Sequence, residues 1–388
     1  MTDFQLQGGL LLYLHSTPCC RKSGASPVRE RTHRLQTLEI FEMEARLLRD
    51  APLVVSLRIA FDGGVFDRLL RGPLASDGLG LPRDAADRLL VLLGAGGVVE
   101  RHGGWHGGWH GDSFGDDLWC LSPDFAVLLG LRATSFAARV RFAALALADL
   151  LNHSDDWLTQ RSRFMQSAQT FRFFDYGRAR ETKAAALEDT APWVRYVTAL
   201  TELEGPVLAP HIPVGDCIDL LEIGGNTGAM SLALLARNDR LTATVLDLPA
   251  VCRLGEAYVA GHSDAERIAF CAADASRDDW PRPGGRPAQM VLFKSVLHDW
   301  EAPAAKKMLQ RAFDYLPPGG RVVVCERGTV EDEPFSGAAP CAADLVFAGF
   351  YRTPEAYEQM LAGLGATLGE RRSLRLGMTF HIVWGTKP

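Results

Sequence analysis

The stretch Leu-Leu-Glu-Ile-Gly-Gly-Asn-Thr-Gly at residues 220–228 decides how the second half of this chain folds. An apolar run ends at Ile223, a glycine-rich turn follows, and apolar residues recur at helical spacing from Met230 onward. This order predicts a buried strand, a tight turn and a helix, which together begin a βαβ unit. Glycines let a backbone approach a ligand closely, so Gly224 and Gly225 are candidate ligand-binding residues. A turn that merely connects strand and helix is the alternative.

Acidic residues lie around this turn. Asp247 ends a second β-rich run, about 20 residues after the turn, the offset at which an acid binds the hydroxyl groups of a ribose. Asn226 stands where a dinucleotide-binding turn has its second glycine, so a pyrophosphate fits poorly. Glu222 and Asp274 add negative charge, which opposes a phosphate and favours a cationic ligand. S-adenosylmethionine (SAM) is cationic and carries no phosphate.

Strand-like and helix-like segments alternate through the rest of this half, which predicts a doubly wound, mainly parallel sheet. The expected strands are 217–223, 242–248, 268–272, 290–297 and 321–326, followed by a terminal strand at 379–386.

Four motifs in fixed order give the chain a family resemblance. They are LLEIGGNTG at 220–228, TVLDLP at 244–249, LFKSVLHDW at 292–300 and LPPGGR at 316–321. With these motifs the chain resembles, over about residues 37–388, the SAM-dependent small-molecule O-methyltransferases of plants and bacteria. The resemblance implies an α/β fold in which a Rossmann-like class I methyltransferase sheet follows a mostly helical winged-helix dimerisation domain. It also implies SAM as cofactor, a small-molecule acceptor and a homodimer.

The catalytic candidates follow the fourth predicted strand. His298 comes directly after the apolar run 290–297, near the carboxyl end of a strand, where open α/β sheets bind ligands. A neutral imidazole is suited to accept a proton near neutral pH. The resemblance makes His298 the general base, Glu326 the acid that orients it and Asp299 a supporting residue. Lys294 precedes His298 by four residues, so strand alternation is expected to place both side chains on one face.

The cofactor-binding set follows from the glycine turn, the acids and the resemblance together. Its members are Glu222, Gly224, Gly225, Asp247, Leu248, Asp274, Ala275 and Lys294.

Two departures from the family pattern affect the chemistry. The family usually has Glu-Arg-Thr where this chain has Tyr351-Arg352-Thr353, so a second carboxylate beside the histidine is missing. Ala275 replaces the aromatic residue that usually follows the adenine-binding acid. A thioether or thiol acceptor needs little or no general base, so S-methylation is an alternative, with Arg352 holding an acceptor carboxylate.

A helical segment before the glycine turn supplies further acceptor-binding candidates. Trp193, Tyr196 and Thr201 lie where the family has a helix that lines the active site, and Tyr351 and Arg352 complete the expected acceptor set. Packing in the protein core is the alternative for the residues of this helix. Most of the aromatic residues of the preceding stretch, 164–176, are expected to be core.

The pattern of helices and strands in the first half of the sequence predicts a winged helix. Helical patterns at 35–60 and 83–93 precede two strand-like runs at 97–101 and 118–121. A winged helix can also bind DNA, which makes a DNA-binding regulator another alternative. Between the strands, the Gly-Gly-Trp-His repeat within 102–111 is expected to be a flexible wing tip rather than a metal site, because its histidines lack preorganised geometry.

Composition limits the partners and the compartment. The 388 residues include 47 acidic and 41 basic ones, a balance that offers no cationic field for nucleic acid or an anionic membrane. Eight cysteines without CxxC spacing indicate reduced thiols and a cytoplasmic protein. The apolar stretch 10–14 is too short to span a membrane.

The expected domains are an irregular extension at 1–34, the winged-helix domain at 35–133, a helical linker at 134–210 and the SAM-binding domain at 211–388.

Overall fold

The structure is a computed structural model that describes residues 37–48, 50–102, 118–330 and 340–388. The chain divides into two compact units, Met1–Ala144 and Leu145–Pro388. The expected extension at 1–34 and the repeat from residue 103 onward lie outside the described residues. Within the described part of the chain, no helix is both long and apolar enough to cross a membrane.

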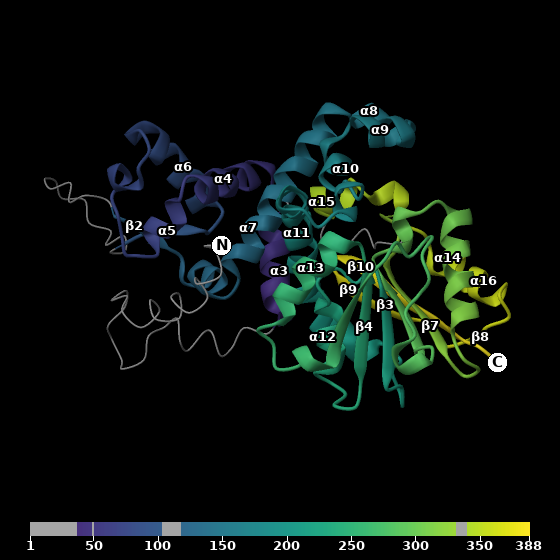
Figure 1. Cartoon of the computed structure of the whole chain (residues 1–388). Helices are drawn as coiled ribbons and strands as arrows, with labels where there is room; N and C mark the ends of the chain where they lie inside the picture. Colours follow the sequence, from purple (N-terminus) through teal and green to yellow (C-terminus); the bar gives the residue numbers. More distant parts are fainter. Residues whose placement is uncertain (1–36, 49, 103–117, 331–339) are drawn as a thin grey trace, which may run out of the picture. The chain divides into compact units, whose positions relative to one another are not determined.

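The first unit is helical with one small hairpin (Figure 1). Its elements are α3 (Thr37–Leu47), α4 (Ala51–Asp62), α5 (Val65–Leu69), α6 (Arg83–Ala95), β1 (Val99–Arg101), β2 (Trp119–Leu121) and the start of α7 (Pro123–Asn152). The strands pair antiparallel, with Val99 opposite Leu121, so the predicted helix and hairpin order of a winged helix is confirmed.

Aromatic packing holds the first unit together. Phe66 lies edge-on to Phe61 with ring centroids 4.8 Å apart, and Phe125 packs against Phe136 at 6.1 Å. Asp50 caps α4 by accepting a hydrogen bond from the backbone N–H of Leu53 at 3.2 Å, which satisfies a donor that the helix start leaves open. These contacts fix the helices that precede the hairpin.

The second unit is an α/β domain. Its helices are the end of α7, α8 (Ser154–Thr159), α9 (Arg161–Ser167), α10 (Gln169–Phe173), α11 (Ala184–Leu208), α12 (Ala229–Leu235), α13 (Pro249–Val259), α14 (Ala302–Tyr315), α15 (Ala342–Leu345) and α16 (Pro354–Ala362). Its strands are β3 (Asp219–Ile223), β4 (Thr242–Asp247), β5 (Ile268–Ala272), β6 (Met290–Lys294), β7 (Arg321–Arg327), β8 (Thr367–Leu368), β9 (Arg372–Leu376) and β10 (Met378–Thr386).

These strands form one sheet in the order β5-β4-β3-β6-β7-β10-β8, with β9 also paired to β10. The strands β3 to β7 are parallel to their neighbours, whereas β10 runs antiparallel to β7. The chain order reverses between β3 and β6, and ligands of open α/β sheets bind outside the carboxyl ends of the strands at such a point. The doubly wound sheet and the terminal strand were both predicted.

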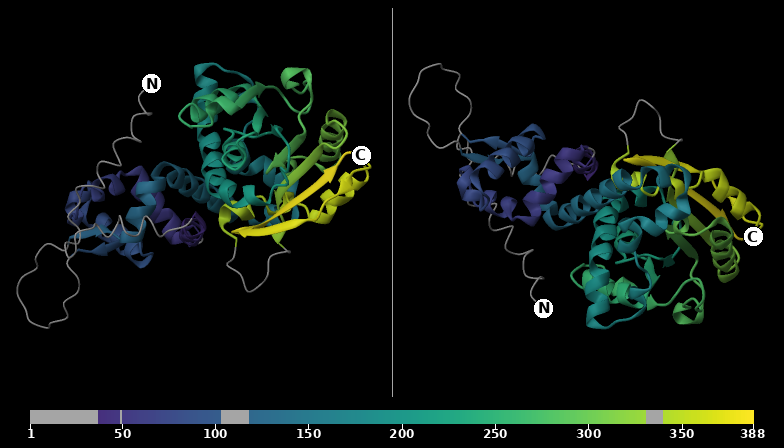
Figure 2. Two further views of the ribbon diagram at one scale, coloured as in Figure 1. Left: turned by 90° about the horizontal axis from the view of Figure 1, so that it is seen from below. Right: turned by 90° about the horizontal axis from the view of Figure 1, so that it is seen from above.

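Helices cover both faces of the sheet (Figures 1 and 2). On one face Leu309 of α14 and Leu361 of α16 join a core with Leu221, Val291 and Val324 from the strands. All five residues of β6 are buried. Burial on both faces explains why the central strands read as continuous apolar runs rather than as alternating ones.

One predicted strand is too long. The run 290–297 was expected to be strand throughout, but β6 ends at Lys294 because Ser295 adopts a φ of 55°, which turns the chain out of the sheet. The short strands β8 and β9 were not predicted.

Candidate active site

Two turns meet at the point where the chain order reverses. The glycine turn follows β3, and the turn that carries His298 follows β6, its partner in the sheet. Gly224 has a φ of 63°, and a Cβ atom there would stand 2.9 Å from Cγ2 of Val296. Gly228 has a φ of 77°, and a Cβ atom would stand 2.6 Å from Cδ1 of Ile268. Glycine is therefore required at both positions.

Strained backbone is confined to the same two turns. Asn226 and Ser295 are the non-glycine residues with positive φ in the described part of the chain, at 54° and 55°. Such conformations cost energy and gather at ligand sites. The Asn226 Nδ2 donates to the Val194 carbonyl at 3.3 Å, while its Oδ1 is buried without a hydrogen-bond partner. That oxygen is available to a donor on a ligand.

Asp247 projects from the end of β4 into this region. Its Oδ2 accepts from the Asn226 N–H at 2.8 Å and its Oδ1 from the Leu248 N–H at 2.7 Å. Each carboxylate oxygen can accept a second hydrogen bond, so two positions remain for ribose hydroxyls. Burial raises the pKa of Asp247 to about 6, against the effect of those two N–H groups.

Glu222 lies on β3 beneath the glycine turn and is 2% exposed. Its Oε2 accepts from the hydroxyl and the N–H of Ser231, at 2.5 and 3.1 Å. Burial raises its pKa to about 7, although Ser231 and the positive charge of Lys294 act in the opposite direction. A cationic ligand nearby would favour the ionised form.

These groups fit SAM better than a phosphate-bearing cofactor. The turn presents the acids Glu222 and Asp247 and the free amide oxygen of Asn226, all hydrogen-bond acceptors, to a ligand with a sulfonium, an ammonium and a ribose diol. A pyrophosphate would instead meet two carboxylates. Gly224 and Gly225 let the turn pack closely against the protein, since a Cβ atom on either would lie within 3 Å of a neighbouring side chain.

Asp274, the expected adenine-binding acid, already has four donors. Its Oδ1 accepts from the N–H and the hydroxyl of Ser276, at 3.0 and 2.5 Å. Its Oδ2 lies 3.0 Å from Arg180 and 3.1 Å from Arg277. Burial raises the pKa of Asp274, but these donors outweigh it and the net shift is downward. Since a carboxylate has about four acceptor positions, an adenine amine must displace one of these donors. The next residue, Ala275, accepts from the Trp280 indole at 3.0 Å.

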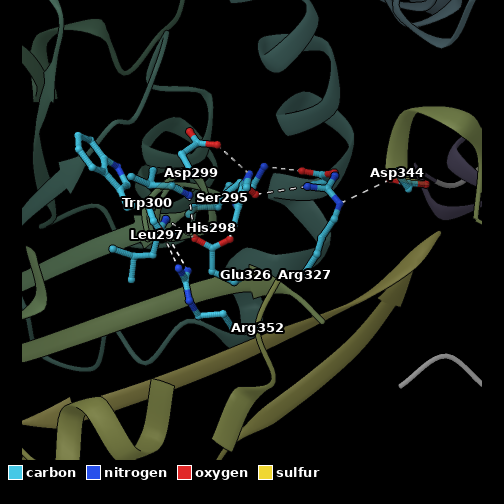
Figure 3. Close-up of polar contacts among 12 residues, drawn as sticks. Ser295, Leu297, His298, Asp299, Trp300, Glu326, Arg327, Asp344 and Arg352 are labelled. Carbon is cyan, nitrogen blue, oxygen red and sulfur yellow. Dashed lines mark hydrogen bonds and ion pairs between the residues drawn. The ribbon is translucent and has the colours of Figure 1, made fainter. Parts of the chain in front are cut away.

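His298 and Glu326 form a buried pair (Figure 3). The His298 Nδ1 lies 2.7 Å from Oε2 of Glu326. The other Glu326 oxygen accepts from the N–H groups of Val296 and Leu297, at 2.8 and 2.7 Å. One carboxylate at the end of β7 thus holds both the imidazole and the backbone of the turn that carries it.

Burial and the neighbouring groups act in opposite directions on the pKa of each member of the pair. Burial alone would lower the pKa of His298, but the charges of Glu326 and Asp299 outweigh it and raise this pKa above the ordinary value. Burial alone would raise the pKa of Glu326, but His298 and the two backbone N–H groups outweigh it and lower this pKa. An ionised carboxylate on Nδ1 keeps the ring hydrogen there and leaves Nε2 as the acceptor.

Asp299 supplies a second carboxylate to the imidazole. Its Oδ1 lies 3.3 Å from the His298 Nε2, and its Oδ2 accepts from the Tyr176 hydroxyl at 2.7 Å. The sequence lacks the family's second carboxylate at Tyr351, whose ring instead packs edge-on against His298 with centroids 5.2 Å apart. The histidine is therefore flanked by two carboxylates despite that departure.

Arg352 has a role other than the expected one. Its guanidinium donates to the carbonyl of Leu297, at 2.7 Å, and to the carbonyl of Trp300, which lie on either side of His298 (Figure 3). These bonds tie the segment just before α16 to the turn that carries His298. Both terminal nitrogens of Arg352 thus bind backbone carbonyls, and its expected contact with an acceptor carboxylate stays a prediction.

Lys294 and Thr201 also differ from expectation. Lys294 is buried, pairs with Glu204 of α11 and donates to the Thr201 hydroxyl at 3.1 Å. Arg327 pairs with the other oxygen of Glu204. Because the chain leaves the sheet at residue 295, strand alternation does not extend to His298, and Lys294 joins a buried ion cluster instead. Thr201 supports that cluster from α11.

Aromatic rings extend outward from the histidine. Phe347 lies 6.4 Å from the His298 ring and 5.8 Å from Phe174. Phe174 in turn contacts Trp193 and Tyr196 at 6.1 and 6.2 Å. Trp193 and Tyr196 are buried in this cluster, so their packing role and their expected place near an acceptor are compatible.

A family comparison agrees with this geometry. Residues 195–366 match the O-methyltransferase domain family. The chain carries an O-methyltransferase domain. The matched segment includes the glycine turn, Asp247, Asp274 and both members of the His298–Glu326 pair. The family resemblance inferred from the motifs is thereby confirmed.

Individual relatives of this O-methyltransferase domain match over shorter segments. The 3-hydroxy-5-methyl-1-naphthoate 3-O-methyltransferase of Streptomyces sahachiroi is 35% identical over 119 residues, which are 31% of this chain and 33% of that protein. The acetylserotonin O-methyltransferase of Bos taurus is 27% identical over 192 residues, 48% of this chain and 52% of that protein. The chain thus spans about a third to a half of these relatives.

Solved structures confirm the fold class of the O-methyltransferase domain and of the helices before it. A structure of the mitomycin 7-O-methyltransferase superposes with a TM-score of 0.66 at 22% identity and covers 86% of this chain and 94% of that one.

Sequence reasoning missed several residues of the site. Tyr176 falls in the aromatic stretch that was interpreted as core, but it is 40% exposed and its hydroxyl donates to Asp299. Arg180 and Phe347 carried no motif. The Glu204 and Arg327 pair joins positions 123 residues apart, so spacing along the chain could not reveal it.

Proposed function

We propose that the protein transfers the methyl group of SAM to a hydroxyl of a small aromatic molecule. The observation that carries this proposal is the buried His298–Glu326 pair beside the glycine turn, 2.7 Å between Nδ1 and Oε2. Bound SAM would supply an electrophilic methyl group on a sulfonium. Glu222, Asp247, Asp274 and the glycine turn would hold it, with Leu248 and Ala275 alongside.

The residues of this chain would perform the proton transfer. The His298 Nε2 is positioned to accept the hydroxyl proton of the acceptor while the methyl group is transferred. Glu326 and Asp299 would then stabilise the resulting imidazolium. Holding the acceptor oxygen in line with the methyl group supplies the remaining rate enhancement.

An aromatic acceptor fits the rings near His298. Phe347 and Tyr351 both present edges or faces to the imidazole, and Phe174, Trp193 and Tyr196 continue the aromatic surface. Aromatic rings pack favourably against such side chains. The relative from Streptomyces sahachiroi is named for a hydroxynaphthoate, an acceptor of this chemistry.

The two alternatives raised by the sequence have less support. S-methylation was motivated by a weakened base and by Arg352 as an acceptor ligand, but Asp299 provides a second carboxylate and Arg352 binds carbonyls. A DNA-binding regulator would not require a buried acid and histidine pair at the end of a central strand.

We further propose a homodimer formed through the first unit, and a cytoplasmic location. The dimer is supported by the family resemblance and by the apolar helices between residues 35 and 95. The location is supported by the cysteines of the described chain, which form no disulfides. Burial raises the pKa of the Cys252 thiol to about 12, which keeps it unreactive.

The test is a methyl-transfer assay with SAM on hydroxynaphthoic acids, simple phenols and thioether acids, with products measured by mass. Methylated phenols or naphthols are expected, and His298→Ala should abolish most of the product. Methylation of thioethers alone would overturn the proposed acceptor class.

A further inference from the structure

Tyr176 connects two parts of the second unit that are distant in sequence. It lies between α10 and the turn at Arg178–Arg180, and its hydroxyl donates to Oδ2 of Asp299 at 2.7 Å, across 123 residues of chain. The edge of its ring packs against Trp193 of α11, with centroids 5.6 Å apart and planes at 71°. The ring contact orients Tyr176, so its hydroxyl is held toward Asp299.

The two oxygens of Asp299 have different partners. Oδ2 accepts from Tyr176, and Oδ1 lies 3.3 Å from the His298 Nε2. The Asp299 side chain is 30% exposed, whereas Glu326 on the other imidazole nitrogen is 1% exposed and held by two backbone N–H groups. Glu326 is therefore fixed by its surroundings, whereas the more exposed Asp299 carboxylate is held beside His298 by the hydrogen bond from Tyr176.

Burial and the neighbouring charges have opposing effects on the pKa values along this chain of contacts. Asp299 and Glu326 raise the pKa of His298, while Arg327 from the end of β7 lowers it, as does burial. Burial raises the pKa of Asp299, whereas His298 and the Tyr176 hydrogen bond lower it and Glu326 raises it. Although Tyr176 is 40% exposed, desolvation of its hydroxyl and the charge of Asp299 raise its pKa well above the ordinary value, so the hydroxyl stays protonated and remains a donor.

Among the residues that the structure describes, the other neighbours of His298 supply no ionised group that could replace Asp299. The Tyr351 ring is held neutral because burial raises its pKa, and Phe347 is apolar. Arg352 of the α16 region is bonded to the carbonyls of the catalytic turn. On the cofactor side, Asp247 contributes a further negative charge near the Tyr176 hydroxyl.

We propose that Tyr176 is a positioning residue for methyl transfer, because it holds the Asp299 carboxylate beside the Nε2 edge of His298. This inference rests on the proposed function. Nε2 is the nitrogen to which the acceptor hydroxyl must deliver its proton, and a fixed negative charge beside it stabilises the imidazolium that forms. Tyr176 itself contacts neither His298 nor the reacting oxygen.

The first test needs neither SAM nor an acceptor. The C–H resonance of His298 is titrated by NMR in the full-length protein and identified by its absence in His298→Ala. In Tyr176→Phe the pKa of His298 should fall, because the carboxylate is no longer held in place and is more readily protonated. Asp299→Asn should lower the pKa at least as much.

A matched control is Tyr258→Phe, which removes a hydroxyl that donates to Glu202 at 3.0 Å away from His298. Its His298 titration should equal that of the wild type. A Tyr176→Phe protein that titrates like the wild type would overturn the positioning role, whether or not the protein is a methyltransferase.

Kinetics provide the second readout. Tyr176→Phe should lower kcat by about 10-fold, the effect of losing one hydrogen bond to a charged group, and move the acid limb of the pH–rate profile to lower pH. A KM change for the acceptor with an unmoved pH profile would contradict the proposal and indicate simple packing. Absence of methyl transfer in the wild type would overturn the proposed function but not the titration result.

Discussion

Glu326→Gln isolates the role of the carboxylate that orients His298. The substitution preserves the shape of the side chain and removes its charge. In the wild type one oxygen accepts from the N–H groups of Val296 and Leu297, and the other faces the His298 Nδ1 at 2.7 Å. The glutamine oxygen can retain both backbone bonds, so its NH₂ group must face Nδ1.

That exchange forces the wrong tautomer on the imidazole. An amide NH₂ can only donate, so Nδ1 must become the acceptor and the ring hydrogen moves to Nε2. Nε2 then cannot take the proton of the acceptor hydroxyl. Loss of a positioned base costs about 10²–10⁴-fold in rate, and replacing the carboxylate by its amide in a serine protease triad costs about 10⁴-fold. We expect kcat to fall within that range, with SAM binding nearly unchanged.

The assay combines turnover with SAM binding. Initial rates on the best phenolic acceptor are measured for the wild type, for Glu326→Gln and for Glu202→Gln, a control with the same chemical change in α11. SAM binding is measured by calorimetry. A Glu326→Gln enzyme that keeps its turnover within about 3-fold of the control would refute the tautomer argument, since even the lower end of the expected loss is far larger.

Glu326→Gln should also change how the stability of the protein depends on pH. The lowered pKa of Glu326 means that its carboxylate stabilises the fold above the ordinary value of 4.5, and that this is lost as the pH falls through the lowered pKa. The raised pKa of His298 means that its charge stabilises the fold below 6.5 and is lost as the pH rises through the raised pKa. Thermal unfolding should show the largest difference between wild type and variant from about pH 4.5 to 6.5.

Four further predictions address the cofactor site and the dimer. Asp247→Ala should weaken SAM binding by about 1–3 kcal/mol in calorimetry, the cost of leaving buried hydrogen-bonding groups unmet, and unchanged binding would remove Asp247 from the site. Gly224→Ala should lower the free energy of unfolding by at least about 1–2 kcal/mol, because a side chain is disfavoured at its positive φ, and a wild-type melting temperature would contradict this. Arg180→Ala should strengthen SAM binding by up to about 5-fold, since it removes a half-exposed ion pair that competes for Asp274, whereas weaker binding would mean that Arg180 holds the ligand. Removing residues 1–34 should leave a dimer in light scattering, and a monomeric full-length protein would disprove the proposed assembly.

The sequence by itself determined the alternation of strands and helices, and with it the sheet. Apolar runs such as 217–223 and 242–248 predict strands because both faces of a central strand are covered, and the glycine turn predicts the first βα connection. His298 and Glu326 could be predicted for a related reason. His298 follows one strand of the parallel part of the sheet and Glu326 lies at the end of its neighbour, and the carboxyl ends of neighbouring parallel strands meet at one edge.

Only the tertiary structure decided which polar groups pair. Lys294 and Arg352 were expected at the cofactor and the acceptor, but Lys294 pairs with Glu204 and Arg352 binds carbonyls of the catalytic turn. Neither outcome follows from spacing, because each contact joins elements that are far apart in sequence. The turn at Ser295 could not be predicted from the sequence either. A positive φ at a serine has no sequence signature, yet it ends β6 and sets the position of His298.

That Asp299 replaces the missing carboxylate beside the histidine could also be seen only in the folded protein. The chain lacks the family's second carboxylate at position 351, and the sequence alone therefore indicated a weakened base. In the folded protein Asp299 lies beside Nε2, and Tyr176 holds it there from a segment that sequence patterns assign to the core. Hydrophobic periodicity reports which face of an element is buried, whereas the direction of a single hydroxyl depends on packing among elements distant in the chain.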